Sequence, residues 1–516
     1  MSAPVVKRVG SRALIVDLPD LATVMDWHAA LTAQPLPRQT DVVAAARTVL
    51  VTFDSPGAAT AATEALASYA PDAAARATAR DIEIEVLYDG ADLAELADSL
   101  GMSSAELIDW HTSTTWVAAF GGFAPGFTYC VPEQPGRALD IPRRATPRTQ
   151  VPAGAVALAG DFSAVYPRTS PGGWQLVGTT RTPMWDSAAT PPALISPGDR
   201  VRYVAVDELP EQAAHSELHL RRPPRRPVFT VEDPGLQALY QDRGRPGNGD
   251  IGVTTSGFAD SASAHAANAA VGNPRGATLL ENVGGLALRA LTEAVVCVTG
   301  AEADITVDAR PVLAAQPAIV PAGAQLVVSA PRTGMRTYVA VRGGLVADAE
   351  LGSAAADMLS GLGPAPLAEG DTVFLSLGRP QSTSTLLSNP LRVAREGADT
   401  VGVVRCVLGP RDDWFTQEAV ERFLSTTFTV TPESNRVGLR LESDDPLERG
   451  REGELASEGM VAGSVQIPPS GQPVLFLRDH AVTGGYPVIA TVISEDIDVA
   501  AQLPPGGKIR FELYSV

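Results

Sequence analysis

The sequence predicts a mainly β protein with an α+β part: an N-terminal ferredoxin-like domain followed by three related, barrel-like modules. Three short pieces recur in the same order along the chain, which a composition bias alone would not produce. Each copy has a turn containing Pro and Gly, then a Gly-Gly pair, then a second Gly turn. The copies are VPAG (151–154), GGW (172–174) and LISPGDRV (194–201); VPAG (320–323), RGGL (342–345) and LAEGDTV (367–373); and, more loosely, IPPSG (467–471), GGY (484–486) and LPPGGKI (503–509).

The turns indicate why the modules should consist of strands. Pro fixes one backbone angle of a turn and Gly supplies a positive φ, so the flanking β-branched runs fold back on each other. A Gly-Gly pair is a poor strand interior and marks a bulge, a barrel corner or a close approach of a ligand or backbone. The 47 Gly and 42 Pro among 516 residues fit a fold with many turns.

Composition limits the classes of function. The length of 516 residues predicts three or four domains. The formal net charge of −19 argues against a surface that binds nucleic acid or acidic membranes. No run of 18 apolar residues exists and the N-terminus lacks an apolar signal core, so we expect no membrane span and a cytoplasmic location.

Lysine and cysteine are both rare. Lys7 and Lys508 are the only lysines, so a Schiff-base or phosphate-loop lysine is nearly excluded and an anion must be held by Arg or by backbone N–H groups. Cys130, Cys297 and Cys406 are isolated and odd in number. We therefore predict buried thiols, no disulfide framework and no metal site.

The order of predicted elements divides the chain into domains. Strands at 12–18, at 41–53 (one or two strands) and at 82–87, with helices at 21–31 and 58–69, indicate the β-α-β-β-α-β order of a split βαβ, ferredoxin-like motif. Further helices are predicted at 92–100, from 103, at 260–272 and from about 416. The predicted domains are 1–80 (ferredoxin-like), 81–207 (first barrel), 208–228 (a polar, then basic and Pro-rich linker), 229–378 (second barrel) and 379–516 (third barrel).

The strongest cationic cluster is formed by Arg143, Arg144 and Arg148, where two prolines keep the chain extended. Guanidinium groups presented rigidly beside the Gly172 and Gly173 turn suit bidentate binding of a carboxylate or phosphate. We therefore predict an anion site that includes Arg144 and Arg148. The alternative is a solvated edge strand protected by charge and proline.

Three aromatic residues, Tyr129, Tyr166 and Trp174, lie in the same Gly-rich stretches and are predicted to form walls of that site. The alternative is an aromatic core at a barrel corner, because all three modules share the Gly pair. The third Gly pair, Gly484 and Gly485, is open to the same two interpretations.

Carboxylates and one histidine in the second half are candidates for acid–base chemistry. Asp412 and Asp413 precede a helix, where they could favour its N-terminus or act as a metal or general-base carboxylate facing Arg436. His480 follows an aspartate as an acid–base pair, although a lone histidine is more often structural. A further binding loop is predicted at Gln241, Asp242 and Arg245 in a polar, Gly-rich setting.

Several long motifs carry a resemblance to a known family. GFAPGFTY, ATPRTQVPAGAVALAG and YPRTSPGGWQLVGTT resemble the B subunit of 5-oxoprolinase (allophanate hydrolase subunit 1). QDRGRPGNGDIGVTTSGFADSASAHAANAAVGNP, VRGGL, GPRDDWF, TPESNRVGLRLE and GSVQIPPSGQPVLFLRDHAVTGGYP resemble the C subunit of that enzyme (allophanate hydrolase subunit 2). The same pair forms the carboxyltransferase part of biotin-dependent urea carboxylase.

The resemblance implies cyclophilin-like β-barrels and ATP-dependent opening of 5-oxoproline to glutamate together with a separate A subunit. It implies ATP, with Mg, as cofactor and a small carboxylate or amide as substrate. No biotin-attachment sequence is present, so no biotin is expected on this chain. A homo-oligomer is compatible with the sequence, and nucleic acid is not expected as a partner.

The chain departs from the family pattern at two places. The family's GSRSTD segment reads Gly-Ser-Ala-Ala-Ala-Asp at 352–357, and the cation after GGYP is Val488. Two other functions stay open: the carboxyltransferase component of a biotin-dependent urea or amide carboxylase, and a non-enzymatic regulator resembling a kinase inhibitor. For the enzyme, we expect Arg148→Ala to lower turnover at least about 100-fold and to leave the melting temperature nearly unchanged.

Overall fold

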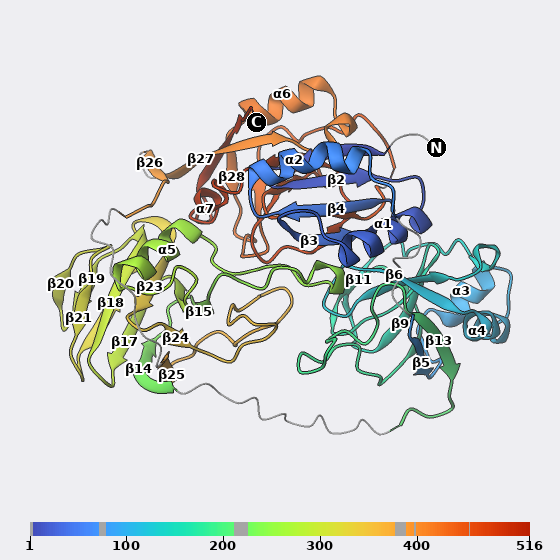
Figure 1. Cartoon of the computed structure of the whole chain (residues 1–516), viewed down its shortest axis with the longest axis horizontal. Helices are drawn as coiled ribbons and strands as arrows, with labels where there is room; N and C mark the ends of the chain where they lie inside the picture. The colour runs from blue at the N-terminus through green and yellow to red at the C-terminus, as the bar shows by residue number, and fades with distance from the viewer. Residues whose placement is uncertain are drawn as a thin grey trace.

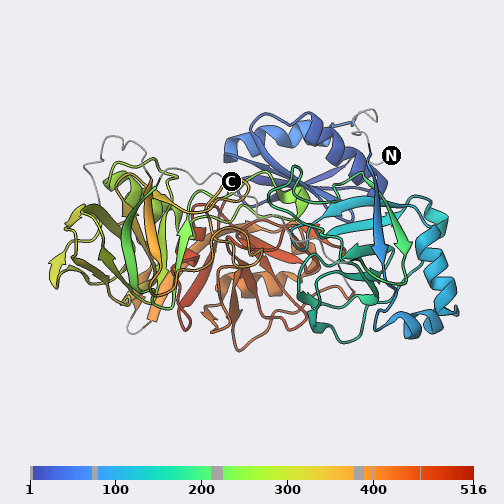
Figure 2. The same ribbon diagram turned by 90° about the horizontal axis from the view of Figure 1, so that it is seen from below.

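The computed structural model describes residues 4–71, 79–210, 225–376, 389–396, 399–453 and 455–515. Most of the predicted linker (211–224) and the segment 377–388 lie outside the described residues. The described part is mainly β, with few helices and barrel-like sheets. Figure 2 shows the last barrel in the middle, with the second module on one side and the first barrel and N-terminal sheet on the other.

The chain begins with a four-stranded antiparallel sheet of order β1-β2-β4-β3. Its elements are β1 (Val5–Val9), β2 (Ala13–Asp17), α1 (Leu21–Ala33), β3 (Gln39–Ala44), β4 (Thr48–Phe53) and α2 (Pro56–Ala67). Alternate residues of β2 point to opposite faces. Leu14 and Val16 pack beneath the two helices, and Ala13 and Ile15 pack with Val482 of the last barrel.

The prediction that the strand at 82–87 completes this sheet is wrong. That strand, β5 (Asp81–Val86), pairs in parallel with β13 (Arg200–Ala205) in the next sheet and buries Ile84 and Val86 in its core. The edge of the N-terminal sheet is taken by β1, which the sequence analysis missed. A hairpin between β1 and β2 needs only the tight turn at Gly10, whose φ is +62°, so it forms locally.

The first barrel is a seven-stranded sheet of order β12-β9-β10-β7-β6-β13-β5. Its remaining elements are α3 (Leu93–Ser99), α4 (Ser104–Ser113), β6 (Trp116–Gly121), β7 (Thr128–Pro132), η2 (Pro135–Arg137), β8 (Arg148–Val151), β9 (Ala155–Ala159), β10 (Phe162–Val165), β11 (Ser170–Gly172) and β12 (Gln175–Thr179). A bridge from Leu87, just after β5, to Thr179 of β12 joins the two edges. A capping box of Ser103 and Glu106 opens α4, the helix predicted from 103.

The second module packs a seven-stranded and a five-stranded sheet around one apolar core. Its elements are β14 (Arg225–Asp233), β15 (Gln237–Gln241), η3 (Gly249–Ile251), α5 (Ser261–Ala270), β16 (Leu279–Val283), β17 (Leu286–Ala290), β18 (Ala294–Glu302), β19 (Ile305–Val307), β20 (Arg310–Val312), β21 (Ala318–Val320), β22 (Gln325–Val328), β23 (Thr333–Val341), β24 (Leu345–Val346) and β25 (Thr372–Ser376). Since β14 begins at Arg225, the last residues of the predicted linker belong to a strand.

The last module is an eight-stranded sheet closed by parallel pairing of β27 with β35. Its elements are β26 (Ala394–Glu396), β27 (Asp399–Leu408), η4 (Asp412–Trp414), α6 (Gln417–Ser425), β28 (Phe428–Val430), β29 (Gly438–Glu442), β30 (Glu458–Gly459), β31 (Ser464–Gln466), β32 (Val474–Phe476), β33 (Thr483–Gly484), β34 (Val488–Val492), α7 (Ile497–Ala500) and β35 (Lys508–Leu513). In Figure 1 this module lies directly behind the N-terminal sheet.

The sequence repeat marks equivalent turns in the three modules. The first pieces end in Gly154, Gly323 and Gly471, which have positive φ and lie just before β9, β22 and β32. The last pieces run into β13, β25 and β35, the final described strand of each module. No helix in the described part of the chain is long and apolar enough to cross a membrane.

Candidate functional site

Three of the motif stretches, far apart in sequence, meet where the two halves of the chain pack together. They are 121–127, 249–257 and 479–485. The N–H of Gly126 donates to the carbonyl of Ile251 at 3.2 Å. A Cβ on Gly252, whose φ is +81°, would overlap the carbonyl oxygen of Ala124. Glycine is therefore required here so that the backbones of the two halves can approach each other.

The third stretch joins the same junction through a carboxylate. The hydroxyl of Ser256 donates to Oδ1 of Asp479 at 2.7 Å. A Cβ on Gly122 would overlap the side chain of Thr483. The family motifs thus serve first to bring the three parts of the chain together.

A buried ion network lies at the base of the junction. Arg436, 2% exposed, donates to both oxygens of Asp479 at 2.9 and 3.0 Å, and to Glu281 from the second module. It also donates to the carbonyl of Gly257 at 2.7 Å. Burial opposes the charge of Arg436, and the two carboxylates more than offset this, so its pKa is raised. A permanently charged arginine therefore links the second and last modules.

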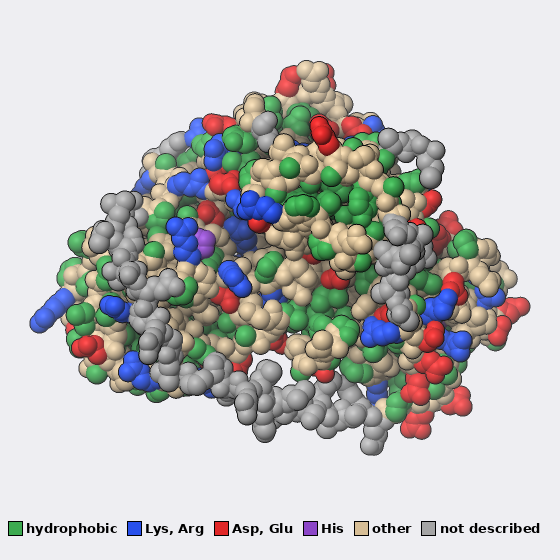
Figure 3. Space-filling view, in the orientation of Figure 1, with side chains coloured by type: hydrophobic (Ala, Val, Ile, Leu, Met, Phe, Trp, Pro, Cys, Tyr) green, Lys and Arg blue, Asp and Glu red, His purple; other side chains and the backbone are tan. Residues whose placement is uncertain are grey.

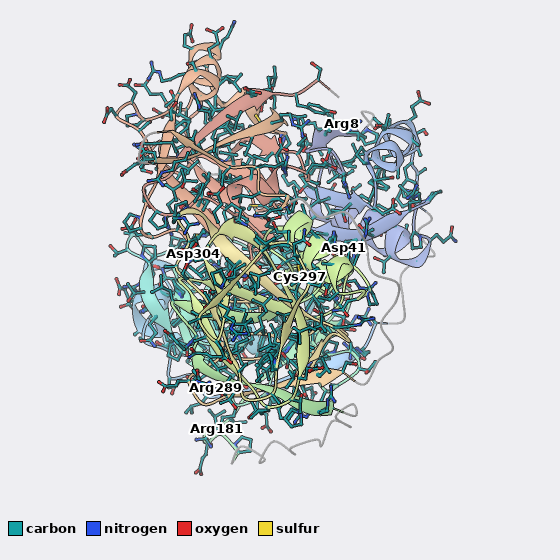
Figure 4. The ribbon with its side chains drawn as sticks, turned by 90° about the vertical axis from the view of Figure 1, so that its left-hand side faces the viewer. Arg8, Asp41, Arg181, Arg289, Cys297 and Asp304 are labelled. Atoms are coloured by element: carbon teal, nitrogen blue, oxygen red, sulfur yellow. The ribbon has the colours of Figure 1, made fainter. Side chains whose placement is uncertain are left out.

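A cleft of about 330 Å³ opens between the N-terminal sheet, the 249–256 segment and the last barrel. His480 lies in its wall; its Nδ1 donates to the carbonyl of Ala481 at 2.7 Å, which leaves the lone pair on Nε2. Burial lowers the pKa of His480 to about 4, so the ring is neutral at pH 7. Asp41 also lies in the wall of this cleft, where the N-terminal sheet meets the 249–256 segment of the second half of the chain (Figure 4). Burial and the nearby Asp250 raise the pKa of Asp41 to about 7.

The structure contradicts the prediction that Arg144 and Arg148 present free guanidinium groups to a ligand. Both pair with Asp92, which is buried: Arg148 at 2.9 and 2.7 Å through two nitrogens, and Arg144 at 2.5 Å. The N–H of Leu176 donates to the same carboxylate at 2.7 Å. Burial raises the pKa of Asp92, but these donors outweigh it and the net shift is downward. The sequence could not show this internal anion, because Asp92 lies more than 50 residues away.

We now expect Arg148→Ala to lower the melting temperature, in contrast to the sequence-based expectation. The change leaves Asp92 with fewer donors, which costs about 1–3 kcal/mol for a buried charged acceptor. Arg143→Ala is the matched control, because Arg143 is an exposed neighbour in the same segment. Differential scanning calorimetry checks both variants. An unchanged melting temperature in Arg148→Ala together with lost turnover would restore the anion-site interpretation.

The Gly pair and the aromatic residues of the first barrel form a core. A Cβ on Gly172 would overlap the ring hydroxyl of Tyr166, and the carbonyl of Gly173 accepts from the N–H of Arg144. Tyr166 and Trp174 are buried, and Tyr129 stands edge-on to Trp174 with ring centroids 5.5 Å apart. This packing is the aromatic core at a barrel corner that was the alternative interpretation of these residues. Their role as walls of a ligand site stays a prediction.

The predicted binding loop after β15 is buried. Gln241 donates to the carbonyl of Ala356 at 2.7 Å, and Arg245 donates to that of Ala355. Asp242 accepts from the hydroxyl of Ser353 at 2.6 Å and from the N–H of Ala354 at 2.8 Å. These side chains hold the 350–357 segment in place. Ala354, which stands where the family has an arginine, is buried, and its backbone N–H donates to Asp242.

The expected pairing of Asp412 or Asp413 with Arg436 is wrong, because Arg436 is occupied by Asp479 and Glu281. Asp413 instead pairs with Arg451 at 2.9 Å, with both side chains about half exposed. The two aspartates form η4 just before α6, which Thr416 caps, so they favour the helix start.

The last Gly pair also has a packing role. Gly484 pairs with Glu458 between β33 and β30, and a Cβ on Gly484 would overlap the sulfur of Met460. Gly485 carries no comparable constraint, since its nearest neighbour would be an oxygen of Leu455 at 3.5 Å. The position of Val488 is buried in β34.

The sequence analysis missed Asp41, Glu281 and Arg478 at the junction. Glu281 and Asp41 lie in strands whose apolar pattern gives no sign that a carboxylate is buried there. Arg478 directly precedes Asp479 and His480. The acid–base pair predicted at these two residues was therefore the signal in the sequence that could have pointed to Arg478. Only the packing of separate modules brings these side chains together.

The described residues show no grouped set of metal ligands, and both lysines have partners within the chain. The described residues contain no group of three His, Cys, Asp or Glu side chains that could hold a metal ion. Lys7 pairs with Asp17 at 3.3 Å, and Lys508 donates to Thr429 at 2.8 Å. Neither lysine is therefore free for a phosphate, so a phosphate held by this chain would contact arginines or backbone N–H groups.

Comparison with known families identifies the class. A model described as "Carboxyltransferase domain, subdomain C and D" matches residues 4–195, and one described as "Carboxyltransferase domain, subdomain A and B" matches residues 251–513. The second match alone covers just over half of the chain. The protein belongs to the carboxyltransferase-domain family.

Within this family the chain is similar to two separate subunits of one enzyme. It is 31% identical to the 5-oxoprolinase C subunit of Escherichia coli (strain K12) over 281 residues, 54% of this chain and 88% of that protein. It is 36% identical to the 5-oxoprolinase B subunit of Escherichia coli O157:H7 over 211 residues, 39% of this chain and 95% of that protein. The chain thus resembles the B and C subunits fused.

Solved structures show the same arrangement in one chain. The crystal structure of TTHA0988 is 33% identical and superposes with a TM-score of 0.84 over 97% of this chain and 99% of that one. The urea amidolyase of K. lactis shares the fold over 77% of this chain, with a TM-score of 0.52 and 22% identity.

Proposed function

We propose that this chain is the fused B and C component of an ATP-dependent 5-oxoprolinase, which opens the lactam of 5-oxoproline to glutamate together with a separate A subunit. The similarity to both the B and the C subunits supports this proposal. The urea amidolyase relatives are less similar, at 29% identity over 55% of this chain for the Lachancea kluyveri protein.

The observation that carries the proposal is the junction itself. The two halves are joined by backbone contacts at glycines and by the Ser256–Asp479 hydrogen bond, all within motif stretches. Fusion of two subunits that must act together keeps this junction assembled at any concentration. The chemistry belongs at the junction, with His480 as the candidate acid–base group and Arg436 as a positioning residue.

A direct test combines the purified chain with the A subunit of a 5-oxoprolinase, ATP, Mg and 5-oxoproline, and measures glutamate. We expect ATP-dependent glutamate release by the mixture and no release by the chain alone, since its described residues hold no phosphate loop and no grouped set of metal ligands. No release by a mixture that forms a stable complex would contradict the proposal. Release by the chain alone would show that it carries the whole site.

A second candidate function is that of a carboxyltransferase component, which the description of the family as a carboxyltransferase domain favours. In that case the chain transfers a carboxyl group from biotin carried by another protein. Adding a biotin carboxylase, its biotinylated carrier, ATP, bicarbonate and urea would give ATP-dependent carboxylation of urea, detected as incorporation of labelled bicarbonate. The 5-oxoproline assay and this assay separate the two proposals.

We further propose the finer domain assignments: a ferredoxin-like N-terminal domain, here with β1 as its fourth strand, and cyclophilin-like barrels at 81–207, 229–378 and 379–516. The two helices on one face of the four-stranded sheet support the first assignment. The shared turn positions of the three modules support the second. We also propose a cytoplasmic location.

A further inference from the structure

The junction cleft has walls from three parts of the chain that sequence analysis treated as separate. One wall is the β1–β2 turn and the face of β3 and β4 that points away from the helices; another is the 249–256 segment; the third is the last barrel. Its volume of about 330 Å³ is at the small end of ligand sites. In Figure 3, Lys and Arg side chains gather around a hollow between the N-terminal sheet and the part of the chain that carries α5.

Two arginines stand in the walls with donor capacity to spare. Arg478 has only long contacts, at 3.4 Å to Asp498 and 3.4 Å to the hydroxyl of Ser261. Asp498 is itself shared with α5, since it accepts from the N–H groups of Ser261 and Ala262. Arg12 pairs more tightly with Glu495 at 2.7 Å. Arg478 is therefore the cation that a ligand carboxylate could pair with at least cost.

Other polar atoms in the walls are also left without partners. Within the part of the chain that the structure describes, Nε of Arg12, Nε of Arg478 and Oγ1 of Thr491 are buried and have no hydrogen-bond partner. The Nε2 lone pair of neutral His480 is an acceptor. A buried polar atom without a partner costs free energy, so a set of them around one cleft fits a ligand that supplies the missing bonds.

The remaining wall is apolar. Its apolar side chains come from the N-terminal sheet and from the last barrel and include Val43, Leu50, Phe53, Met460, Val461 and Val482. The cleft therefore offers cations, the carboxyl of Asp41, uncharged donors and acceptors, and a hydrocarbon surface within a small volume. This combination suits a compact molecule with an apolar body and one anionic end.

We propose that this cleft binds a small monocarboxylic acid with a compact apolar body and an uncharged amide, with the carboxylate on Arg478 and the amide facing His480 and the wall hydroxyls. This inference rests on the proposed function for its specific ligand, because 5-oxoproline carries a carboxylate, three ring carbons and a lactam. The cleft places the substrate between the two fused halves, so neither half alone could hold it.

Binding to the complex of the full chain with the A subunit is measured by calorimetry with three probes. They are 5-oxoproline, N-acetylglycine, which is an open-chain carboxylate with an amide, and 2-pyrrolidinone, the same ring without the carboxylate. We expect Arg478→Gln to weaken binding of the two carboxylates about 10-fold or more, since a charge-assisted hydrogen bond is lost. Binding of 2-pyrrolidinone should be unchanged. Arg422→Gln, exposed on α6 of the same module, is the matched control and should change none of them.

A second variant, Val461→Phe, fills the cleft and should abolish binding of all three probes without altering any charge. Equal carboxylate affinities in wild type and Arg478→Gln, or no binding of either carboxylate to the wild type, would overturn the cleft proposal. Wild-type turnover of 5-oxoproline in both variants would overturn it and leave the proposed function intact. Binding of N-acetylglycine that depends on Arg478, with no turnover of 5-oxoproline, would uphold the cleft and reject the proposed function.

Discussion

Arg436→Met is expected to lower the free energy of unfolding by about 3–5 kcal/mol, the usual cost of removing one partner from a buried ion pair. Asp479 and Glu281 are each 2% exposed or less; without Arg436, Asp479 loses its ion-pair partner and Glu281 keeps only Arg336, at 3.5 Å. Methionine has a similar length, so the loss reflects charge more than volume. Urea unfolding followed by fluorescence measures the change.

Two comparisons make this result specific. Arg422→Met, on the exposed surface of α6 in the same module, should change stability by no more than about 0.5 kcal/mol. The double variant Arg436→Met with Asp479→Asn should recover part of the loss, because one uncompensated charge is removed with its partner. A double variant less stable than Arg436→Met would show that the carboxylate is needed for another reason, such as its bond from Ser256.

Arg411→Ala is expected to have the second-largest effect, because Arg411 joins the last barrel to the N-terminal sheet. Its guanidinium donates to Glu458, which is buried, and to both oxygens of Asp17 on β2. Burial raises the pKa of Glu458 even with the arginine present. Without Arg411, we expect the free energy of unfolding to fall by about 3 kcal/mol or more.

The same variant should loosen one contact in particular. Hydrogen exchange of the β1 and β2 amides should speed up in Arg411→Ala, since the N-terminal sheet loses its charged contact with the barrel. Amides of the second module should exchange as in the wild type. Faster exchange throughout the chain would show a general loss of stability, and unchanged exchange in β2 would show that the apolar face around Ile15 and Val482 holds the sheet alone.

Both arginines come from motifs that carry the family resemblance, GPRDDWF and TPESNRVG. In the structure they hold modules together, as do Gly122, Gly126 and Gly252. A motif shared by a family therefore contains residues for assembly as well as for chemistry. The junction is where the two requirements meet, because a site between modules exists only if the modules are fixed to each other.

Local patterns in the sequence determined the secondary structure and the repeat. Turn glycines such as Gly154 and Gly323 need positive φ whatever surrounds them, and Asp260 and Thr416 begin their helices by side-chain bonds to nearby N–H groups. These are interactions over a few residues, so the residue types alone specify them. The mainly β fold followed from such signals, whereas the fused order of the two halves followed from the resemblance of the long motifs to the B and C subunits.

Only the tertiary structure decided which charges are internal and where the cleft lies. Arg148 was expected to face a ligand, yet it pairs with Asp92 from a distant segment, while Arg436 pairs with Glu281 across two modules. The strand β5 was assigned to the wrong sheet for a related reason: its partner β13 is more than 100 residues away. Pairing between distant segments depends on which surfaces pack together, and a linear pattern of residue types does not contain that information.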